Sequence, residues 1–428
     1  MRTLLILSPF FDVSCPPWGI SFYHSYFSKL GSNTFLDLNL LCYKKNKLFW
    51  EDYEKTKSTR GLQESFLYFK QIIKDSILKE SEKYDSIYIT GNYYFSKKID
   101  DILKSLGRKS IVIDSYSDEK QSLFPPKFCP ENFISAYSVY SQDFSCFDGS
   151  LYNQPNSLEI STSFGCLNRC SFCVEKRNHP KIVLKNPKDI IHEINQSLKY
   201  HKIDSVYYGD ASLNNNLDHL DEVLACSRQL GLMWEANMII RPEMNYKFFT
   251  KLKASGCRAL HIGIESFSKR VLKHNGKTMA LKENFEEIIK DAEKAGIKLN
   301  CNIMFGLPGE TESDFRYSLE KIKNLASEYC IFNPSYSCCT FDENTPKEVF
   351  QNLGISIPIC YDVINECDII RYDLWFDSES NAVKRNSRLL YFIATLDKKE
   401  GYFFSEKTKK AIMARIFEAR KTVWTKLL

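Results

Sequence analysis

The sequence has few glycines and no long apolar run. Seventeen glycines serve 428 residues, and no two of them are adjacent. No apolar stretch reaches 18 residues, so we expect no membrane-spanning helix. The first apolar run, Leu4 to Leu7, is too short for the core of a signal peptide. We therefore expect a cytoplasmic protein without a membrane partner.

A strong excess of charge of one sign is also missing. The 58 basic and 53 acidic residues leave a net charge of +5, which is too small to indicate nucleic-acid binding by itself. No Lys/Arg-rich added domain is evident, so we do not expect a nucleic-acid partner. The hydrophobic fraction of 43% and the charged fraction of 26% are those of an ordinary globular protein, which excludes extended disorder.

Cysteine, by contrast, is plentiful. Fifteen cysteines are many for a chain without an export signal. In a reducing compartment we expect them to be buried thiols together with a metal or cluster site, rather than disulfides.

The first part of the chain predicts short strands that alternate with helices. Strands are expected at 3–8, 34–41, 86–90 and 110–113, and helices at 20–30, 61–83 and 97–106. Such alternation predicts a parallel sheet with helices on its faces. We expect a doubly wound, Rossmann-like α/β domain over residues 1–130 and a linker over 131–155, where prolines interrupt the pattern.

From residue 156 the alternation resumes with a longer period. Six strands are expected at 158–162, 205–208, 233–238, 259–264, 299–305 and 330–335, separated by helices at 187–199, 216–230, 246–255, 281–295 and 312–325. This pattern predicts a partial (β/α)6 barrel over residues 156–345. Residues 346–428 are expected to be mostly helical and to end in a basic helix over 406–427.

The most informative motif is Cys166-x3-Cys170-x2-Cys173, directly after the first barrel strand. Thiolates are the natural ligands of iron–sulfur clusters, and three of them leave one iron of a four-iron cube open. The alternative is a zinc site with His179 as a further ligand, although the spacing is not the usual pairwise zinc arrangement.

This motif, with Phe172 before its last cysteine, resembles that of the radical S-adenosylmethionine (radical SAM) enzymes. The resemblance implies that Cys166, Cys170 and Cys173 hold a [4Fe–4S] cluster. It further implies that S-adenosyl-L-methionine (SAM) chelates the fourth iron and is cleaved to a 5′-deoxyadenosyl radical. Phe172 matches the position that packs near the adenine. A flavodoxin- or ferredoxin-like electron donor is implied as a partner.

Further matches to the family follow in order between about residues 158 and 353, nearly half of the chain. Each lies at the carboxyl end of an expected barrel strand, where barrel enzymes build their active sites. The segments resemble the turns that contact SAM in the family. The resemblance therefore implies cofactor binding by Gly209, Asp210, Arg241, Glu265, Ser266, Met304 and Gly306.

The N-terminal domain is similar to the cobalamin-binding domain that precedes many radical SAM barrels, and Pro16-Pro17-Trp18-Gly19 resembles the opening of its first helix. No Asp-x-His-x-x-Gly motif occurs, and Asp114-Ser115 stands where the family usually carries Gly-Gly. Side chains there reduce the room for a corrin. Cobalamin binding, a scaffold role and a substrate-docking role all stay open.

Two adjacent cysteines, Cys338 and Cys339, follow the last expected barrel strand. A thiol there could return a hydrogen atom to a substrate radical, as in peptide epimerases of the superfamily; alternatively both are buried small hydrophobic residues. Our leading expectation is therefore radical modification of an unactivated carbon of a peptide or natural-product substrate, by epimerisation, cross-linking or rearrangement. The alternatives are a cobalamin-dependent C-methyltransferase and a non-catalytic iron–sulfur protein.

Overall fold

The computed structural model describes residues 2–9, 18–49, 59–90, 93–112, 145, 152, 157–175, 179–200, 202–282, 284–335, 339, 341, 345–362, 367–370, 372–396, 406–421 and 424–427. Within these ranges the chain divides into two compact units, each of which is described by itself. The first contains residues 1–162 and 184–209, and the second contains residues 163–183 and 210–428. In the part that the structure describes, every helix is too short or too polar to cross a membrane. The domain boundaries at residues 130, 155 and 345 stay predictions.

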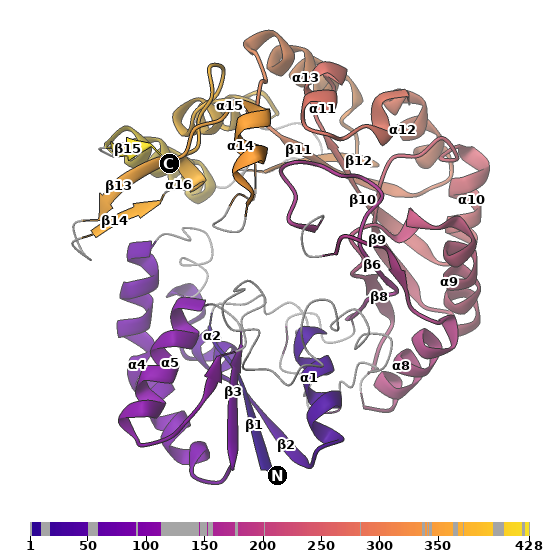
Figure 1. Ribbon diagram of the computed structural model, residues 1–428. Coiled ribbons are helices and arrows are strands. Elements are labelled where there is room, and N and C mark those ends of the chain that lie inside the picture. Colours follow the sequence, from indigo (N-terminus) through magenta and orange to yellow (C-terminus); the bar gives the residue numbers. More distant parts are fainter. Residues whose placement is uncertain are drawn as a thin grey trace. The chain divides into compact units, whose positions relative to one another are not determined.

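The first unit contains a four-stranded parallel sheet in the order β2-β1-β3-β4. Its strands are β1 (Arg2–Leu7), β2 (Ser32–Asp37), β3 (Ser86–Thr90) and β4 (Ile111–Val112). The helices are α1 (Trp18–Ser28), α2 (Leu38–Lys45), α4 (Thr59–Ser81) and α5 (Tyr93–Ser105). Helix α1 packs on β1 and β2, whereas α5 packs on β3 and β4 (Figure 1). The order reverses between β1 and β3, the kind of point where open α/β sheets bind ligands.

The core of this sheet follows from its sequence. Leu4 to Leu7 of β1 are all at most 2% exposed, as expected for a central parallel strand that is covered on both faces. The strand expected over 34–41 is partly wrong, because β2 ends at Asp37 and the next residues form α2. Asp37 caps that helix by accepting a hydrogen bond from the Leu40 N–H at 2.7 Å.

Two more strands of the first unit begin the expected barrel. β5 (Ser157–Ile160) and β8 (Ser205–Tyr208) pair in parallel, with Ser157 opposite Ser205. Helix α8 (Pro187–Tyr200) connects them in the chain, after the short strand β7 (Val183–Leu184).

The second unit carries the other four expected barrel strands, in the order β12-β11-β10-β9 and all parallel. They are β9 (Met233–Met238), β10 (Cys257–Glu265), β11 (Lys298–Met304) and β12 (Cys330–Ser335). The helices are α9 (Leu217–Leu230), α10 (Tyr246–Ala254), α11 (Lys269–His274), α12 (Phe285–Lys294) and α13 (Glu312–Leu325), with 3-10 turns η4 (Leu213–Asn215) and η5 (Met279–Lys282). In Figure 1, α9, α10 and α12 lie along the outer side of these strands. The six predicted barrel strands are thus all present.

The C-terminal region is less helical than expected. Besides α14 (Lys347–Leu353), η6 (Tyr372–Leu374), α15 (Ala382–Leu396) and α16 (Glu406–Lys421), it contains an antiparallel sheet in the order β14-β13-β15. The strands are β13 (Pro358–Asp362), β14 (Cys367–Ile370) and β15 (Trp424–Leu427). The helix expected over 406–427 is therefore wrong in its last turn, because Cys360 and Pro358 of β13 pair with Trp424 and Leu427. Tertiary pairing overrides the helical pattern there.

Candidate functional site

The cysteine loop, residues 165–173, follows the short strand β6 (Ser163–Phe164). Gly165 has a φ of +88°, and a Cβ atom there would lie 2.6 Å from the Lys181 carbonyl oxygen, so the turn requires glycine. The Asn215 side chain then holds both sides of the first turn: its Nδ2 donates to the Gly165 carbonyl at 2.8 Å, and its Oδ1 accepts from the Leu167 N–H at 3.0 Å. The path into the loop is thus fixed by hydrogen bonds between the Asn215 side chain and the backbone.

The three thiols of the loop share a largely buried environment. Cys170 is 6% exposed, and Cys166 and Cys173 are partly buried. Burial raises the pKa of Cys170 to about 12 and also raises the pKa values of Cys166 and Cys173. Cys173 also acts electrostatically on Cys166 and on Cys170, and Cys166 acts on Cys170. Metal ligation requires thiolates, so loading this loop with metal must release protons.

His179, the histidine ligand of the zinc alternative, contacts the Glu175 carboxylate. His179 Nδ1 lies 3.0 Å from Glu175 Oε1, and the same carboxylate oxygen accepts from the Gly165 N–H at 2.9 Å. In the described ranges, no three His, Cys, Asp or Glu side chains are placed to bind one metal ion together. A four-iron cluster does not require this, because each thiolate binds a different iron. His179 therefore supports the loop from its base through Glu175.

An apolar cluster brings several predicted site residues together. Its buried members include Cys170, Phe172, Leu307 and Cys339, and Cys173 and Met304 pack against it as partly buried side chains. Phe172 is 7% exposed and Cys339 is 6% exposed. The structure therefore places the cysteine loop, the end of β11 and the segment after β12 against one another. Cys338 lies outside the described residues.

The residue after β8, Gly209, lies against the Glu159 side chain of β5. A Cβ atom at Gly209 would lie 2.7 Å from Glu159 Oε1, so a larger residue would require this side chain to move.

Asp210, the next residue, is 1% exposed and accepts a hydrogen bond from Ser163 Oγ at 2.5 Å. The Asn237 side chain of β9 donates to the Asp210 carbonyl at 3.0 Å. Asp210 thus ties the strand before the cysteine loop to β9.

The end of β10 is the most unusual part of the site. The pairing of β10 with β11 shifts register between Gly263 and Glu265, and Glu265 has a φ of +62°. In the part of the chain that the structure describes, it is the one non-glycine residue with a positive φ, a conformation that side chains rarely adopt. Its Oε1 accepts from Lys277 Nζ at 2.9 Å, and both side chains are nearly buried. Backbone strain of this kind concentrates at functional sites.

The cysteine loop lies in a region that matches a known protein family. The sequence pattern described as "Radical SAM superfamily" matches residues 160–322. The chain carries a radical SAM domain.

Two curated relatives match at low identity. One is an uncharacterized methyltransferase of Pyrococcus horikoshii, 25% identical over 250 residues, which cover 56% of this chain and 53% of the relative. The other is a tRNA-2-methylthio-N(6)-dimethylallyladenosine synthase of Lachnoclostridium phytofermentans, 25% identical over 219 residues, which cover 46% of this chain and 48% of the relative. The chain thus spans about half the length of these relatives.

A solved structure extends the similarity of fold to the whole chain. The radical SAM methyltransferase TsrM from Kitasatospora setae, solved with cobalamin and a [4Fe–4S] cluster, covers 98% of this chain and 99% of its own. The identity is 14% and the TM-score is 0.63. The expected fold class is therefore confirmed: a Rossmann-like, cobalamin-binding-like domain followed by a radical SAM region.

Two predicted residues of the radical SAM domain act as supports. Arg241 Nη1 donates to the carbonyls of Asn214 and Asn215 at 3.0 and 3.1 Å, so it holds the turn that carries the Asn215 side chain. Ser266 is fully buried, and its Oγ lies 3.3 Å from Ser318 Oγ of α13 and accepts from the Ser268 N–H. Whether either contacts a cofactor stays a prediction.

The turn after β11 is held by the C-terminal region. Gly306 has a φ of +79°, and a Cβ atom there would lie 2.3 Å from Arg385 Cγ of α15. Glu310 Oε2 accepts from the Gly306 N–H at 2.6 Å and from Arg388 Nη1 at 2.7 Å. Asp377 accepts from the Gly309 N–H at 2.7 Å. Residues 377–388 thus fix the shape of residues 306–310.

Sequence reasoning missed two buried cations of this site that form ion pairs, Lys277 and Arg388. Each pairs with a glutamate at or after the end of a barrel strand, Glu265 or Glu310. The signal that could have found them is weak: a buried carboxylate needs a partner, but nothing in the local pattern says which cation supplies it.

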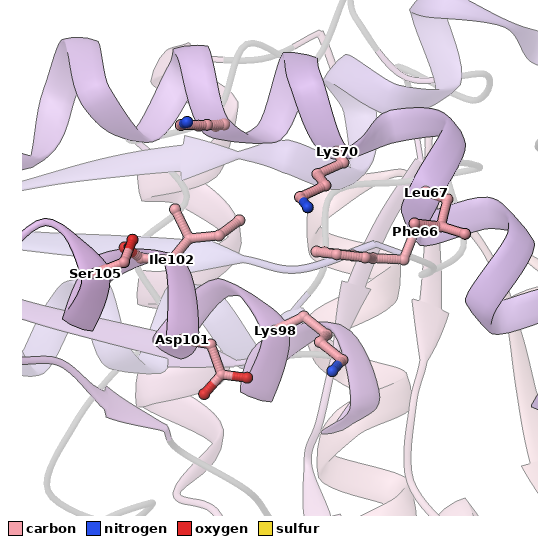
Figure 2. A pocket seen from close by; sticks show the side chains of 8 residues that line it. Phe66, Leu67, Lys70, Lys98, Asp101, Ile102 and Ser105 are labelled. Atoms are coloured by element: carbon pink, nitrogen blue, oxygen red, sulfur yellow. The ribbon is translucent and has the colours of Figure 1, made fainter. Parts of the chain in front are cut away.

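A separate hollow lies in the first unit, between α4 and α5 (Figure 2). It has a volume of about 590 Å³, and its lining residues are Phe66, Leu67, Lys70, Lys74, Lys98, Asp101, Ile102 and Ser105. None of these residues was predicted as part of the site, and none belongs to the radical SAM domain.

Proposed function

We propose that this chain is an enzyme that reductively cleaves SAM at a [4Fe–4S] cluster and uses the resulting radical to modify an unactivated carbon of a peptide or natural-product substrate. The observation that carries the proposal is the cysteine loop: three neighbouring, largely buried thiols within a radical SAM domain. A non-catalytic iron–sulfur carrier has no need of the strand ends that surround this loop.

The donor set fits such a cluster. Three thiols on one loop offer three thiolate ligands and leave one coordination site open. When bound, the cluster would supply the electron that cleaves the sulfonium of SAM. Cys166, Cys170 and Cys173 would hold it, and the buried Lys277 ammonium would balance part of the thiolate charge. An external flavodoxin- or ferredoxin-like protein would deliver the electron.

The remaining predicted residues have proposed roles around SAM. Phe172 and Met304 pack in the same apolar cluster as Cys170 and Cys173, which supports an apolar wall for the adenine. Glu265 would offer its carboxylate to the cofactor, with Ser266 behind it. Gly209, Asp210, Arg241 and Gly306 complete the proposed cofactor set; for these four, the hydrogen bonds and close side-chain contacts described above support a role in shaping the site.

The first test replaces one ligand. In Cys170→Ala, anaerobically reconstituted and reduced, we expect deoxyadenosine formation from SAM to fall to background, because the cluster loses a ligand. Cys226→Ala is the matched control, since Cys226 is a buried thiol of helix α9 outside the loop. It should form deoxyadenosine as the wild type does. Cleavage by Cys170→Ala at the wild-type rate would refute the proposal.

Two outcomes for the substrate radical are proposed. Hydrogen-atom return, as in epimerisation, is supported by Cys339, which lies in the same apolar cluster as Cys170 and Phe172. Cross-linking and rearrangement are the other proposed outcomes that involve no methyl transfer.

Methyl transfer is supported by the fold similarity to TsrM, which includes the cobalamin-binding-like domain. Residues 114 and 115, where the glycines are replaced, lie outside the described ranges, so cobalamin binding by this chain stays a proposal.

Product mass in deuterated water separates the two outcomes. Deuterium at the modified carbon would support return of a solvent-exchangeable hydrogen, and Cys339→Ser should then abolish its incorporation. A gain of one methyl group, together with cobalt retained after reconstitution with hydroxocobalamin, would support methyl transfer instead.

A further inference from the structure

The cysteine loop has a buried ammonium group beside it. Lys277 is 5% exposed, and its charge acts on the thiols of Cys170 and Cys166. Its Nζ donates to Glu265 Oε1 at 2.9 Å, so the side chain is an ammonium cation held in an ion pair. Nothing in the family resemblance or the comparisons assigns it a role.

The backbone before Lys277 is attached directly to the loop. The Ser171 N–H donates to the Asn275 carbonyl at 3.1 Å. Gly276 has a φ of +72°, and a Cβ atom there would lie 2.9 Å from the Arg169 carbonyl oxygen. The turn therefore touches the loop on both sides of Cys170, which gives Lys277 a fixed position relative to the thiols.

Glu265, the partner of Lys277, is held in place by an unusual backbone conformation. Glu265 reaches it from a backbone with positive φ. A Cβ atom at Gly263 would lie 2.3 Å from Glu265 Oε1 and 2.8 Å from Lys277 Nζ, so this glycine leaves room for the ion pair. The register shift at the end of β10, the positive φ of Glu265 and the missing side chain at Gly263 thus all allow this ion pair to form.

The two charges of the ion pair are held differently relative to the cysteine loop. Lys277 follows directly on the turn that contacts the loop at Arg169 and Ser171, whereas Glu265 reaches the ion pair from the end of β10. Of the two charges, the ammonium is therefore the one attached to the turn that touches the loop, and it sets a positive potential there. A positive potential favours the addition of an electron to any centre bound there.

We propose that Lys277 is a positioning residue that raises the reduction potential of the cluster held by the cysteine loop, and that Glu265 holds its ammonium in place and limits the effect. This inference rests on the proposed function, because it requires the cluster. It concerns the ease of electron entry rather than the ligands themselves.

The experiment is a redox titration of the anaerobically reconstituted full-length chain, followed by electron paramagnetic resonance. In Lys277→Met we expect the ratio of reduced to oxidised cluster at a fixed potential to fall at least tenfold, equivalent to 59 mV for a one-electron couple. Lys277→Arg keeps the charge and should stay within twofold of the wild type. Glu265→Gln should shift the ratio in the opposite direction.

A charge-balanced double variant provides the test if Lys277→Met does not fold. Lys277→Met/Glu265→Gln removes both charges and should show a smaller fall in the same direction. Its matched control is Lys185→Met/Glu193→Gln, because Lys185 and Glu193 form another buried pair, with 2.8 Å between Nζ and Oε2, in the first unit. That control should leave the potential unchanged.

The outcomes separate the inference from the proposed function. A wild-type chain that takes up no four-iron cluster would refute the proposed function. A loaded wild type whose potential equals that of both Lys277→Met and the double variant would overturn the inference alone. An equal shift in Lys277→Arg and Lys277→Met would also overturn it, since the charge is kept in one and lost in the other.

Discussion

Two buried ion pairs of the second unit differ in what they connect. Lys277 and Glu265 are 12 residues apart, and their pair lies beside the cysteine loop. Arg388 and Glu310 are 78 residues apart, and their pair joins helix α15 to the turn after β11. The first pair is local and places a charge near the proposed cluster. The second is long-range and fixes the shape of a turn.

Their surroundings differ in the same sense. The Arg388 guanidinium lies over the Phe315 ring at 5.1 Å, and Glu310 also accepts from the Gly306 backbone. Burial raises the pKa of Glu310 to about 7, although the Arg388 charge opposes this. Buried pairs are costly to break, because removing one partner leaves the other uncompensated. The Arg388–Glu310 pair is the more deeply buried of the two. We therefore expect it to contribute more to stability, and we expect the local pair to govern electron entry.

Breaking the long-range pair should have the largest effect on stability. Arg388→Met leaves the Glu310 carboxylate buried without its cation, and we expect the free energy of unfolding to fall by about 3–5 kcal/mol. Arg388→Met/Glu310→Gln should recover most of this loss. Urea unfolding of both variants measures the difference. Equal stability of the single and double variants would contradict the assigned role of the pair.

Gly306 and Gly263 lie beside the two ion pairs, and replacing each by alanine tests the two roles separately. Gly306→Ala forces a side chain onto a φ of +79° and against Arg385 Cγ, which is 2.3 Å from the new Cβ. The backbone conformation alone costs about 1–2 kcal/mol, and the overpacking about 1–3 kcal/mol more.

Gly263→Ala meets only the ends of two flexible side chains, Glu265 and Lys277. It should destabilise the fold less than Gly306→Ala does and shift the cluster potential more. Thermal unfolding and redox titration of the two variants side by side measure both effects. The reverse ranking in either measurement would count against the division of roles.

The sequence predicts the strands of both units well but not these pairs. Buried runs such as Leu4 to Leu7 and the alternation of strands and helices are local signals, and the six barrel strands appear within about two residues of their predicted bounds. The cysteine loop is equally local. The Arg388–Glu310 pair depends on a contact across 78 residues, and the positive φ of Glu265 depends on a register shift between strands. Neither leaves a periodic pattern in the sequence.

Asp314, in the first turn of helix α13, offers a pH test. Burial would raise the pKa of Asp314, but hydrogen bonds from Ser268, Thr311 and Arg270 outweigh it and lower the pKa from 3.8 to about 2. A lowered pKa stabilises the fold above pH 4, and the contribution disappears as the pH falls from about 4 to about 2. It amounts to about 2 kcal/mol. Asp314→Asn should therefore be less stable than the wild type at pH 7 and equally stable near pH 2. A constant difference between the two across that range would show that Asp314 does not supply this pH dependence.

The smallest effect should come from an exposed pair on the same helix. Arg316 Nε donates to Glu312 Oε1 at 3.0 Å, with the two side chains 69% and 50% exposed. Solvent screens this pair, so Arg316→Ala should change the free energy of unfolding by less than about 1 kcal/mol. Glu312 is also reached by the buried Arg388 at 3.4 Å, so Arg316→Ala removes an arginine contact to the same glutamate while leaving the buried pair intact. If Arg316→Ala were as damaging as Arg388→Met in urea unfolding, burial would not be what separates the two arginines, and the expected cost of breaking the Arg388–Glu310 pair would lose its physical basis.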